Sequence, residues 1–369
     1  MTTGNNTGDP GAAWPKATER LIELGWSDFF ARHLQQLPSP ALRAGRVIAQ
    51  HRGALLIGSE FGDLRAEMTG RLVHEAGRSE ALPAVGDWVA FSQVANGAAQ
   101  IHAVLPRKSK FSRKVAGSTT DEQVVAANID YAFIVSALTA ELNMRRLERY
   151  LTVAWESGAQ PVVVLAKADL REDAREVARE VGEIAVGAPV LVTSALSGEG
   201  FADLMPYLGS HSTVCLIGSS GVGKSSLVNR LLGEERQVVR QVRSDDRGRH
   251  TTAHRELFRL PQGALIIDTP GMRELQLWGD PTAARRAFAD LEEAASGCRF
   301  TDCRHEAEPG CAVRDAVAAG LIEARRLDSF HRLHREMQFL EIKQDRRARS
   351  EEKRKHKVLA RSLRRHYQQ

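Results

Sequence analysis

The chain has 369 residues, of which 43% are hydrophobic and 26% are charged, as in ordinary folded globular proteins. This composition excludes collagen, coiled-coil rods and wholly disordered chains, and the length suits two or three domains. The net charge is +5, but residues 343–369 hold eleven Lys or Arg against three acids, so this segment carries +8 and the rest carries −3.

The apolar runs fall well short of the roughly 18 to 20 residues that span a bilayer. Residues 1–40 lack the basic start and apolar core of a secretory signal, and they are predicted to be a disordered or short helical extension. We therefore expect a cytoplasmic protein that does not associate with membranes.

Residues 41–110 alternate apolar and polar positions in short segments that Gly, Pro, Asn and Asp separate. Five short strands in some seventy residues predict a closed β-barrel of the oligonucleotide-binding (OB) type. An SH3-like barrel would give almost the same pattern, and a barrel that only packs is an alternative to one that binds nucleic acid. The predicted strands are 45–51, 54–57, 64–68, 86–91 and 99–104.

Residues 111–280 change to apolar strands that alternate with amphipathic helices. This pattern predicts a mostly parallel sheet covered on both faces, and ligands of such sheets bind at the carboxyl ends of the strands. The predicted strands are 131–135, 162–165, 190–192, 214–217 and 265–267.

Two of these strands end in residues that could recognise a nucleotide base. The first ends in a K-x-D pattern and the second in Ser-Ala. The Asp169 carboxylate can accept the N1–H and the exocyclic amine of guanine, a pairing that adenine cannot offer, while the Lys167 stem covers the base. Losing a buried pairing of this kind makes discrimination steep. The predicted base-binding residues are Ala166, Lys167, Ala168, Asp169, Ser194 and Ala195.

A phosphate-binding loop, G-x-x-x-x-G-K-S, follows the strand at 213–217 and leads into a helical run. Backbone N–H groups and the helix N-terminus would surround the phosphates, Lys224 would reach the β and γ phosphates, and Ser225 would bind Mg²⁺. The predicted phosphate-binding residues are Gly218, Ser219, Ser220, Gly221, Val222, Gly223, Lys224, Ser225 and Ser226.

A D-x-x-G motif follows the strand at 265–267. Asp268 would hold Mg²⁺ through water, and the Gly271 N–H would meet the γ-phosphate. The polar stretch 245–252 lies between the two motifs and predicts a switch loop, in which Thr251 or Thr252 completes the Mg²⁺ shell.

A cluster of Cys and His residues lies in the helical segment 281–342, with the spacing C-x4-C-x-H-x5-C. Three thiolates and one imidazole form a ligand set typical of a closed structural Zn²⁺ site, and one zinc ion per chain is expected. Unliganded thiols or a stray disulfide are the alternative. Cys215, in an apolar strand, is expected to be a small core residue. The predicted zinc ligands are Cys298, Cys303, His305 and Cys311.

The basic tail, residues 343–369, could neutralise several phosphates along a nucleic acid, although a solvated helix face would have the same composition. The base-binding motifs precede the phosphate loop, which reverses the usual order of a GTPase and indicates a circular permutation. With the barrel and the cysteine cluster, the chain resembles the family of ribosome small-subunit-dependent GTPase A over residues 41–340.

The resemblance implies a monomeric GTP hydrolase that binds the small ribosomal subunit and its 16S rRNA, with GTP or GDP, Mg²⁺ and Zn²⁺ as ligands. It also implies that His250 orients or activates water, although a solvent-facing loop histidine is an equal alternative. The chain departs from the family at Ala166, which lacks a hydrogen-bonding side chain, so the expectation is either weaker guanine selectivity or selectivity supplied by the backbone. Met272 replaces the Gln that orients water in many GTPases, so slow intrinsic turnover is expected.

The predicted fold is therefore an α/β P-loop GTPase, circularly permuted, with an N-terminal OB-type barrel and a C-terminal zinc-binding helical domain. The predicted function is GTP hydrolysis in late maturation of the small ribosomal subunit, stimulated by that subunit. The alternatives are an RNA-binding module with a vestigial or structural nucleotide site and, with less support, a GTPase that acts on another RNA particle or on the large subunit.

Overall fold

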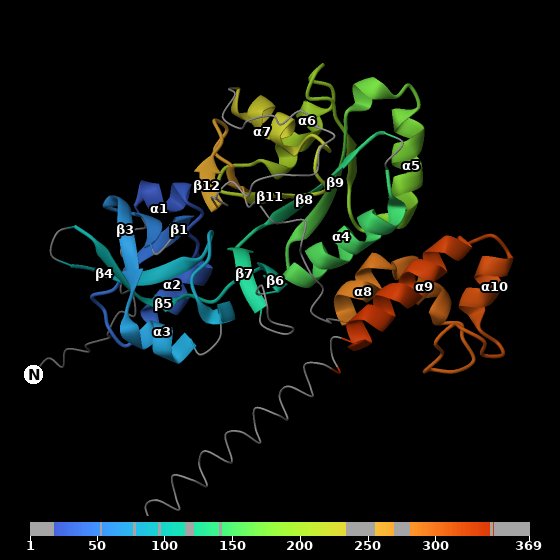
Figure 1. Cartoon of the computed structure of the whole chain (residues 1–369), viewed down its shortest axis with the longest axis horizontal. Helices are drawn as coiled ribbons and strands as arrows, with labels where there is room; N and C mark the ends of the chain where they lie inside the picture. The colour runs from blue at the N-terminus through green and yellow to red at the C-terminus, as the bar shows by residue number, and fades with distance from the viewer. Residues whose placement is uncertain are drawn as a thin grey trace, which may run out of the picture.

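The computed structural model describes residues 18–51, 54–76, 79–94, 97–114, 122–139, 142–233, 255–268, 281–339 and 342. A small β-barrel, a larger α/β unit and a helical module follow one another along the chain (Figure 1). None of the helices within these ranges is long and apolar enough to cross a membrane.

Two short helices, α1 (Glu19–Glu23) and α2 (Asp28–Gln35), precede the barrel and pack on it. Asp28 lies in the first turn of α2, where a negative charge faces the positive end of the helix dipole. The rings of Trp26 and Phe30 lie 4.7 and 5.6 Å from the buried ring of Trp88 in the barrel. The described part of the N-terminal extension is therefore attached to the barrel by aromatic packing.

The predicted five-stranded barrel is confirmed. Its strands pair in the order β1-β2-β3-β5-β4, and β4 pairs back with β1, which closes the sheet. Helix α3 (Gly70–Ala76) and the 3₁₀ turn η1 (Ser79–Ala81) lie between the third and fourth strands, in the manner of an OB-type barrel. The strands are β1 (Arg43–His51), β2 (Ala54–Ser59), β3 (Gly62–Met68), β4 (Trp88–Gln93) and β5 (Ala99–Val104).

The α/β unit contains the predicted parallel sheet in the order β10-β9-β8-β11-β13, and β12 adds to its edge in antiparallel orientation. β12 was not predicted, because charged residues flank its two apolar positions, Leu257 and Phe258. The strands are β8 (Tyr131–Ala137), β9 (Gln160–Ala166), β10 (Val190–Val192), β11 (Thr213–Ile217), β12 (Arg255–Arg259) and β13 (Leu265–Asp268).

Helices and 3₁₀ turns connect the strands of this sheet, and buried apolar clusters lie on both of its faces. These elements are α4 (Met144–Ser157), η2 (Ala168–Leu170), α5 (Ala174–Ile184), α6 (Phe201–Leu204), η3 (Met205–Tyr207) and α7 (Lys224–Leu232). The parallel strands therefore end together at one edge of the sheet, where the predicted motifs begin.

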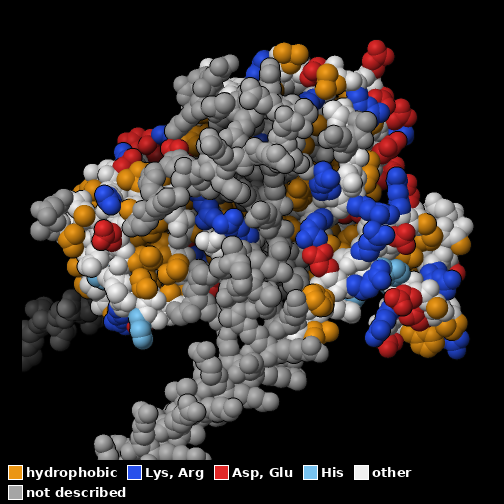
Figure 2. Space-filling model, viewed as in Figure 1, with side chains coloured by type: hydrophobic (Ala, Val, Ile, Leu, Met, Phe, Trp, Pro, Cys, Tyr) orange, Lys and Arg blue, Asp and Glu red, His pale blue; other side chains and the backbone are white. Residues whose placement is uncertain are grey.

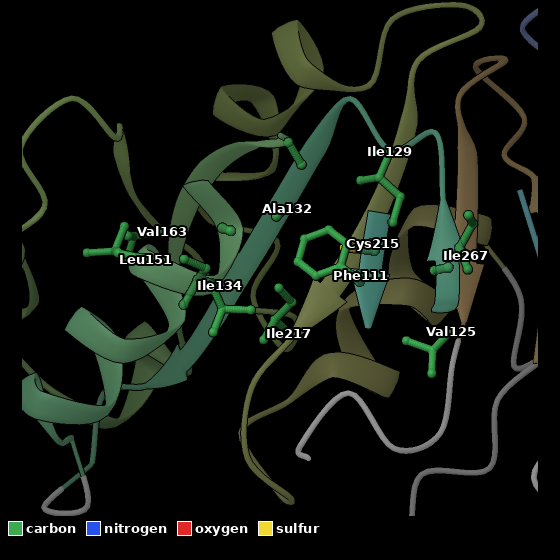
Figure 3. Packing of buried hydrophobic residues seen from close by; sticks show 14 of the residues in the cluster. Phe111, Val125, Ile129, Ala132, Ile134, Leu151, Val163, Cys215, Ile217 and Ile267 are labelled. Carbon is green, nitrogen blue, oxygen red and sulfur yellow. The ribbon is translucent and has the colours of Figure 1, made fainter. Parts of the chain in front are cut away.

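A two-stranded hairpin, β6 (Lys110–Lys114) and β7 (Glu122–Ala127), covers part of the parallel sheet. Figure 3 shows the Phe111 ring of this hairpin beside Cys215 and Ile217 of β11. Phe111 is 1% exposed and Cys215 is 0% exposed, so the hairpin contributes to the core of the α/β unit. The prediction that Cys215 is a core residue is confirmed.

The barrel and the α/β unit share one continuous sheet, because β1 pairs with β12. The buried Arg46 side chain lies at this junction and donates to the carbonyl oxygens of Gly86 and Asn128 and to the Thr213 hydroxyl, at 3.2, 3.1 and 3.0 Å. Burial lowers the pKa of Arg46 to about 10, so the guanidinium remains charged at neutral pH. These hydrogen bonds fix the barrel against β11.

The helical module begins with α8 (Pro281–Ala287), α9 (Ala289–Ala295) and α10 (Ala312–Ala318), and residues 324–339 are also helical. It packs beneath α4 (Figure 1). Arg326, which is 4% exposed, donates to Glu148 of α4 at 3.0 Å and to both carboxylate oxygens of Asp290. A second pair, Arg149 with Glu336, spans the same interface at 2.6 and 3.0 Å.

Replacing Arg326 by alanine is expected to lower the free energy of unfolding of the docked module by about 3–5 kcal/mol, because the buried Glu148 carboxylate and the half-buried Asp290 carboxylate would both lose this partner. Urea denaturation followed by circular dichroism measures this loss. The matched control is Arg325→Ala, since Arg325 is exposed and pairs with the neighbouring Glu323. Equal effects of the two substitutions would contradict a docking role for Arg326.

Candidate functional site

The phosphate loop connects the end of β11 to the start of α7, as predicted. Gly218, Gly221 and Gly223 have φ angles of 151°, 76° and 108°, and two of the three lie deep in the region that favours glycine. A Cβ atom at Gly218 would lie 2.3 Å from the carbonyl oxygen of Val135 in β8, so this position excludes every side chain. The glycines thus allow the loop to turn tightly against the sheet.

Lys224 is the first residue of α7, and its ammonium group is directed back over the loop. Its Nζ donates to the carbonyl oxygens of Gly218 and Ser219 at 2.8 and 2.6 Å. The ammonium therefore lies inside the curve of the loop, beside the N-terminal end of α7. An anion held there would meet both the lysine charge and the positive end of the helix dipole.

Arg146 also contacts this loop. It lies in the first turn of α4, which Asn143 caps by accepting the backbone N–H of Arg146. The guanidinium donates to the Ser219 hydroxyl at 2.8 Å. A cavity of about 320 Å³ opens here between α4 and the loop, and it is lined in part by Thr139, Asn143, Arg146 and residues 219–222. Sequence reasoning missed Arg146, since no motif links it to the loop.

A second cavity, of about 840 Å³, adjoins Gly223 at the end of the loop, and Lys167 lines both cavities. It brings together four of the residues predicted to bind guanine with one side of α7, from Gly223 before the helix to Gly233 after it. Lys167 has a left-handed backbone, with φ of 62°, which turns the chain sharply between β9 and η2. The cavity is lined by Ala166, Lys167, Asp169, Leu170, Thr193, Ala195, Leu196, Gly223, Ser226, Leu227, Asn229, Arg230 and Gly233.

Ser194 orients the carboxylate that was predicted to read the base. Its hydroxyl donates to Asp169 Oδ1 and accepts the backbone N–H groups of Leu196 and Ser197, each at 3.2 Å. The Ala168 N–H donates to the Thr193 carbonyl at 3.1 Å, which joins the two segments that were predicted to bind the base. The Asp169 carboxylate is thus held at the edge of the cavity by a buried serine.

Asp268 is the last residue of β13. This strand pairs in parallel with β11, so that Ile267 lies beside Cys215. Asp268 therefore lies at the same edge of the sheet as the start of the phosphate loop, as the D-x-x-G motif predicts. Gly271, His250, Thr251, Thr252 and Met272 lie outside the described residues.

The four predicted zinc ligands form one cluster. The donor atoms of Cys298, Cys303, His305 and Cys311 all lie within 4.8 Å of one another, and their mutual separations include 3.4, 3.6 and 4.0 Å. Tetrahedral zinc with its usual bond lengths separates its ligand atoms by about 3.5 to 3.8 Å. The donor set and its spacing therefore fit a closed zinc site.

Glu308 organises the loop that carries these ligands. Its carboxylate accepts the backbone N–H groups of Arg304, Glu306 and Ala307 at 2.9 to 3.0 Å. Backbone N–H groups, its own first and then those of Arg304 and its neighbours, lower the pKa of Glu308 to about 2. Sequence reasoning missed this residue, because an acidic residue in a polar loop has no distinctive pattern.

Comparison with known proteins identifies the family. The RsgA GTPase family model matches residues 104–278. The small ribosomal subunit biogenesis GTPase RsgA of Opitutus terrae is 48% identical over 330 residues, which cover 86% of this chain and 90% of that protein. The chain belongs to the RsgA GTPase family. This result confirms the resemblance noted in the sequence and the prediction of a GTP-hydrolysing enzyme.

Other RsgA relatives agree over most of the chain. The protein of the same name from Streptomyces avermitilis is 42% identical over 346 residues, covering 93% of this chain and 92% of that protein. The crystal structure of YjeQ from Thermotoga maritima superimposes with a TM-score of 0.61 at 27% identity, covering 80% of this chain and 98% of that one. YloQ, described as a circularly permuted GTPase, has a TM-score of 0.58 at 23% identity, covering 82% and 96%. The predicted permuted fold is confirmed.

Proposed function

We propose that this GTPase acts in maturation of the small ribosomal subunit, binds it in a nucleotide-dependent way and is stimulated by it. The observation that carries the proposal is the adjacency of the two recognition elements. The cavity that contains Asp169 and Ala195 extends to Gly223 and Ser226 of the phosphate loop and α7. One guanine nucleotide could therefore reach both. The name shared by the relatives supports the ribosomal role.

In this proposal Asp169 pairs with the N1–H and amine of guanine, and the Lys167 stem covers the ring. The phosphates of GTP or GDP lie on the backbone of residues 218–226, with Lys224 beside the β and γ phosphates. Ser225 and Asp268 would hold Mg²⁺, which neutralises phosphate charge when bound. Gly271 would meet the γ-phosphate, Thr251 or Thr252 would sense it, and His250 would orient the attacking water.

The helical module would hold one zinc ion through Cys298, Cys303, His305 and Cys311. Bound zinc would fasten this small unit, which has little core of its own. We propose the domain bounds 1–40, 41–110, 111–280, 281–342 and 343–369 for the extension, barrel, GTPase domain, zinc module and basic tail.

The RNA-binding surface is proposed to include the barrel, the zinc module and the tail. In Figure 2, Lys and Arg side chains gather where α4 and the C-terminal helices meet. Helices α4 and α8 contain five arginines, which are Arg145, Arg146, Arg149, Arg285 and Arg286. Such a surface attracts phosphates and releases counterions when it binds 16S rRNA. We expect the protein to act in the cytoplasm as a monomer.

Purified small subunits are expected to raise the rate of GTP hydrolysis by about tenfold or more at low salt, because a bound partner can complete the catalytic groups. Phosphate release measured with small subunits, large subunits and neither gives the comparison. Equal stimulation by large subunits would contradict the small-subunit assignment. Absence of phosphate release under all three conditions would instead favour an RNA-binding module with a vestigial nucleotide site.

A further inference from the structure

The loop formed by residues 194–198 is the wall of the larger cavity that faces Asp169. The Gly198 N–H donates to the Ser194 carbonyl at 2.8 Å, so this carbonyl points into the turn. The N–H and C=O groups of a trans peptide point in opposite directions. The Ala195 N–H, which shares that peptide, therefore points away from the turn, and Ala195 lines the cavity.

Arg230 of α7 holds the other carbonyl oxygens of this loop. Its Nη1 donates to Ala195 O and Leu196 O at 3.1 and 3.2 Å, and its Nη2 lies 3.5 Å from Ser197 O. The guanidinium also lies over the Phe201 ring, 5.6 Å from its centroid. One planar cation thus contacts three consecutive carbonyl groups of the wall, which suits the fork geometry of arginine and not the single point charge of lysine.

The loop is shaped to admit this side chain. Gly198 has a φ of 89°, and a Cβ atom there would lie 2.2 Å from Nη2 of Arg230. Any larger residue at position 198 would displace the guanidinium. Ser194 holds the N–H groups of the same loop from within, through Leu196 and Ser197. Ser194 therefore accepts hydrogen bonds from the N–H groups of this short segment, and Arg230 donates hydrogen bonds to its carbonyl oxygens.

The residue at position 166 explains why the contact between Arg230 and the 194–198 loop matters. Ala166 lines the cavity, and its methyl group lies 3.6 Å from a Cβ atom built on Gly223 of the phosphate loop. A methyl group cannot form a hydrogen bond that ties the loop to the base-binding wall. Arg230 provides such a hydrogen-bonded link by another route. It belongs to α7, the helix that follows the phosphate loop, and its guanidinium donates to the Ala195 carbonyl of the wall.

We propose that Arg230 is a positioning residue for guanine specificity. It fixes the 194–198 loop so that the Ala195 N–H meets the O6 acceptor of guanine beside Asp169. Adenine carries an amine in place of O6, and a fixed N–H donor would face that amine without an acceptor. This inference rests on the proposed binding of guanine in the larger cavity.

Replacing Arg230 by methionine keeps the length of the side chain and removes its donors. The dissociation constant for GDP is expected to rise about tenfold, the effect of losing about one charge-assisted hydrogen bond. That for ADP is expected to change less than about twofold, because adenine makes no use of the ordered loop. Calorimetry, with competition for weak ligands, measures both constants. The KM for GTP should rise while kcat changes little, which a general loss of folding would not produce.

Three further variants make the result decisive. Arg230→Lys should give an intermediate GDP/ADP ratio, and Arg179→Met, an exposed position on α5, should leave the ratio unchanged. Asp169→Asn should abolish the preference for GDP if the cavity binds guanine at all. If Asp169→Asn changes the GDP/ADP ratio and Arg230→Met, with unchanged thermal unfolding, does not, the role of Arg230 is overturned. If neither variant changes the ratio, the proposed guanine site itself is wrong.

Discussion

Replacing Lys224 by alanine is expected to lower the rate of GTP hydrolysis by about 10²- to 10³-fold, the usual cost of removing one preorganised donor from a transition state. The ammonium lies within the phosphate loop, in contact with the carbonyl oxygens of Gly218 and Ser219. From there it would face the charge that develops on the transferred phosphoryl group. Single-turnover phosphate release with saturating small subunits measures the loss in the chemical step.

The matched control is Lys110→Ala. Lys110 is a surface lysine of β6 that pairs with Glu122 at 2.9 Å, and it carries the same charge but lines neither cavity beside the phosphate loop. Its loss should change the rate less than about twofold. A Lys224→Ala variant that hydrolyses GTP at the wild-type rate while remaining folded would show that the loop does not carry the chemistry.

Zinc removal is the second change with a large expected effect. Metal analysis should find one zinc ion per chain, and Cys311→Ser should reduce this to a small fraction. In peptides, binding of structural zinc contributes about 10–16 kcal/mol to folding, so the module should lose its ordered structure without it. Hydrogen exchange across residues 281–339 reports this directly, because backbone amides of the unfolded module would exchange quickly.

Cys215→Ala is the control for the loss of a thiol, since Cys215 is buried in β11 and lies outside the cluster. That variant should keep its zinc and the slow exchange of the helical module. The opposite outcome, a metal-free Cys311→Ser protein whose module exchanges as slowly as wild type, would show that the cluster does not stabilise this part of the fold.

Two kinds of pattern made much of the fold predictable. Period-two alternation identified all five barrel strands, and continuous apolar runs identified the parallel strands of the α/β unit. β12 lacked either signal, because only Leu257 and Phe258 interrupt its charged residues. Its strand conformation depends on pairing with β13 on one side and β1 on the other, which are partners distant in sequence.

The sequence by itself determined where the phosphate loop, the K-x-D and Ser-Ala segments, the D-x-x-G strand end and the cluster of three Cys and one His lie along the chain. Their chemistry depends on residue types at short fixed spacings, which a linear chain displays directly. Only the tertiary structure decided that Arg146 reaches Ser219, that Arg230 holds the 194–198 loop and that Arg326 joins α4 to the helical module. These contacts connect residues 35 to 178 positions apart. The sequence around a single arginine does not indicate which residue it will contact, because the packing of helices against the sheet determines that contact.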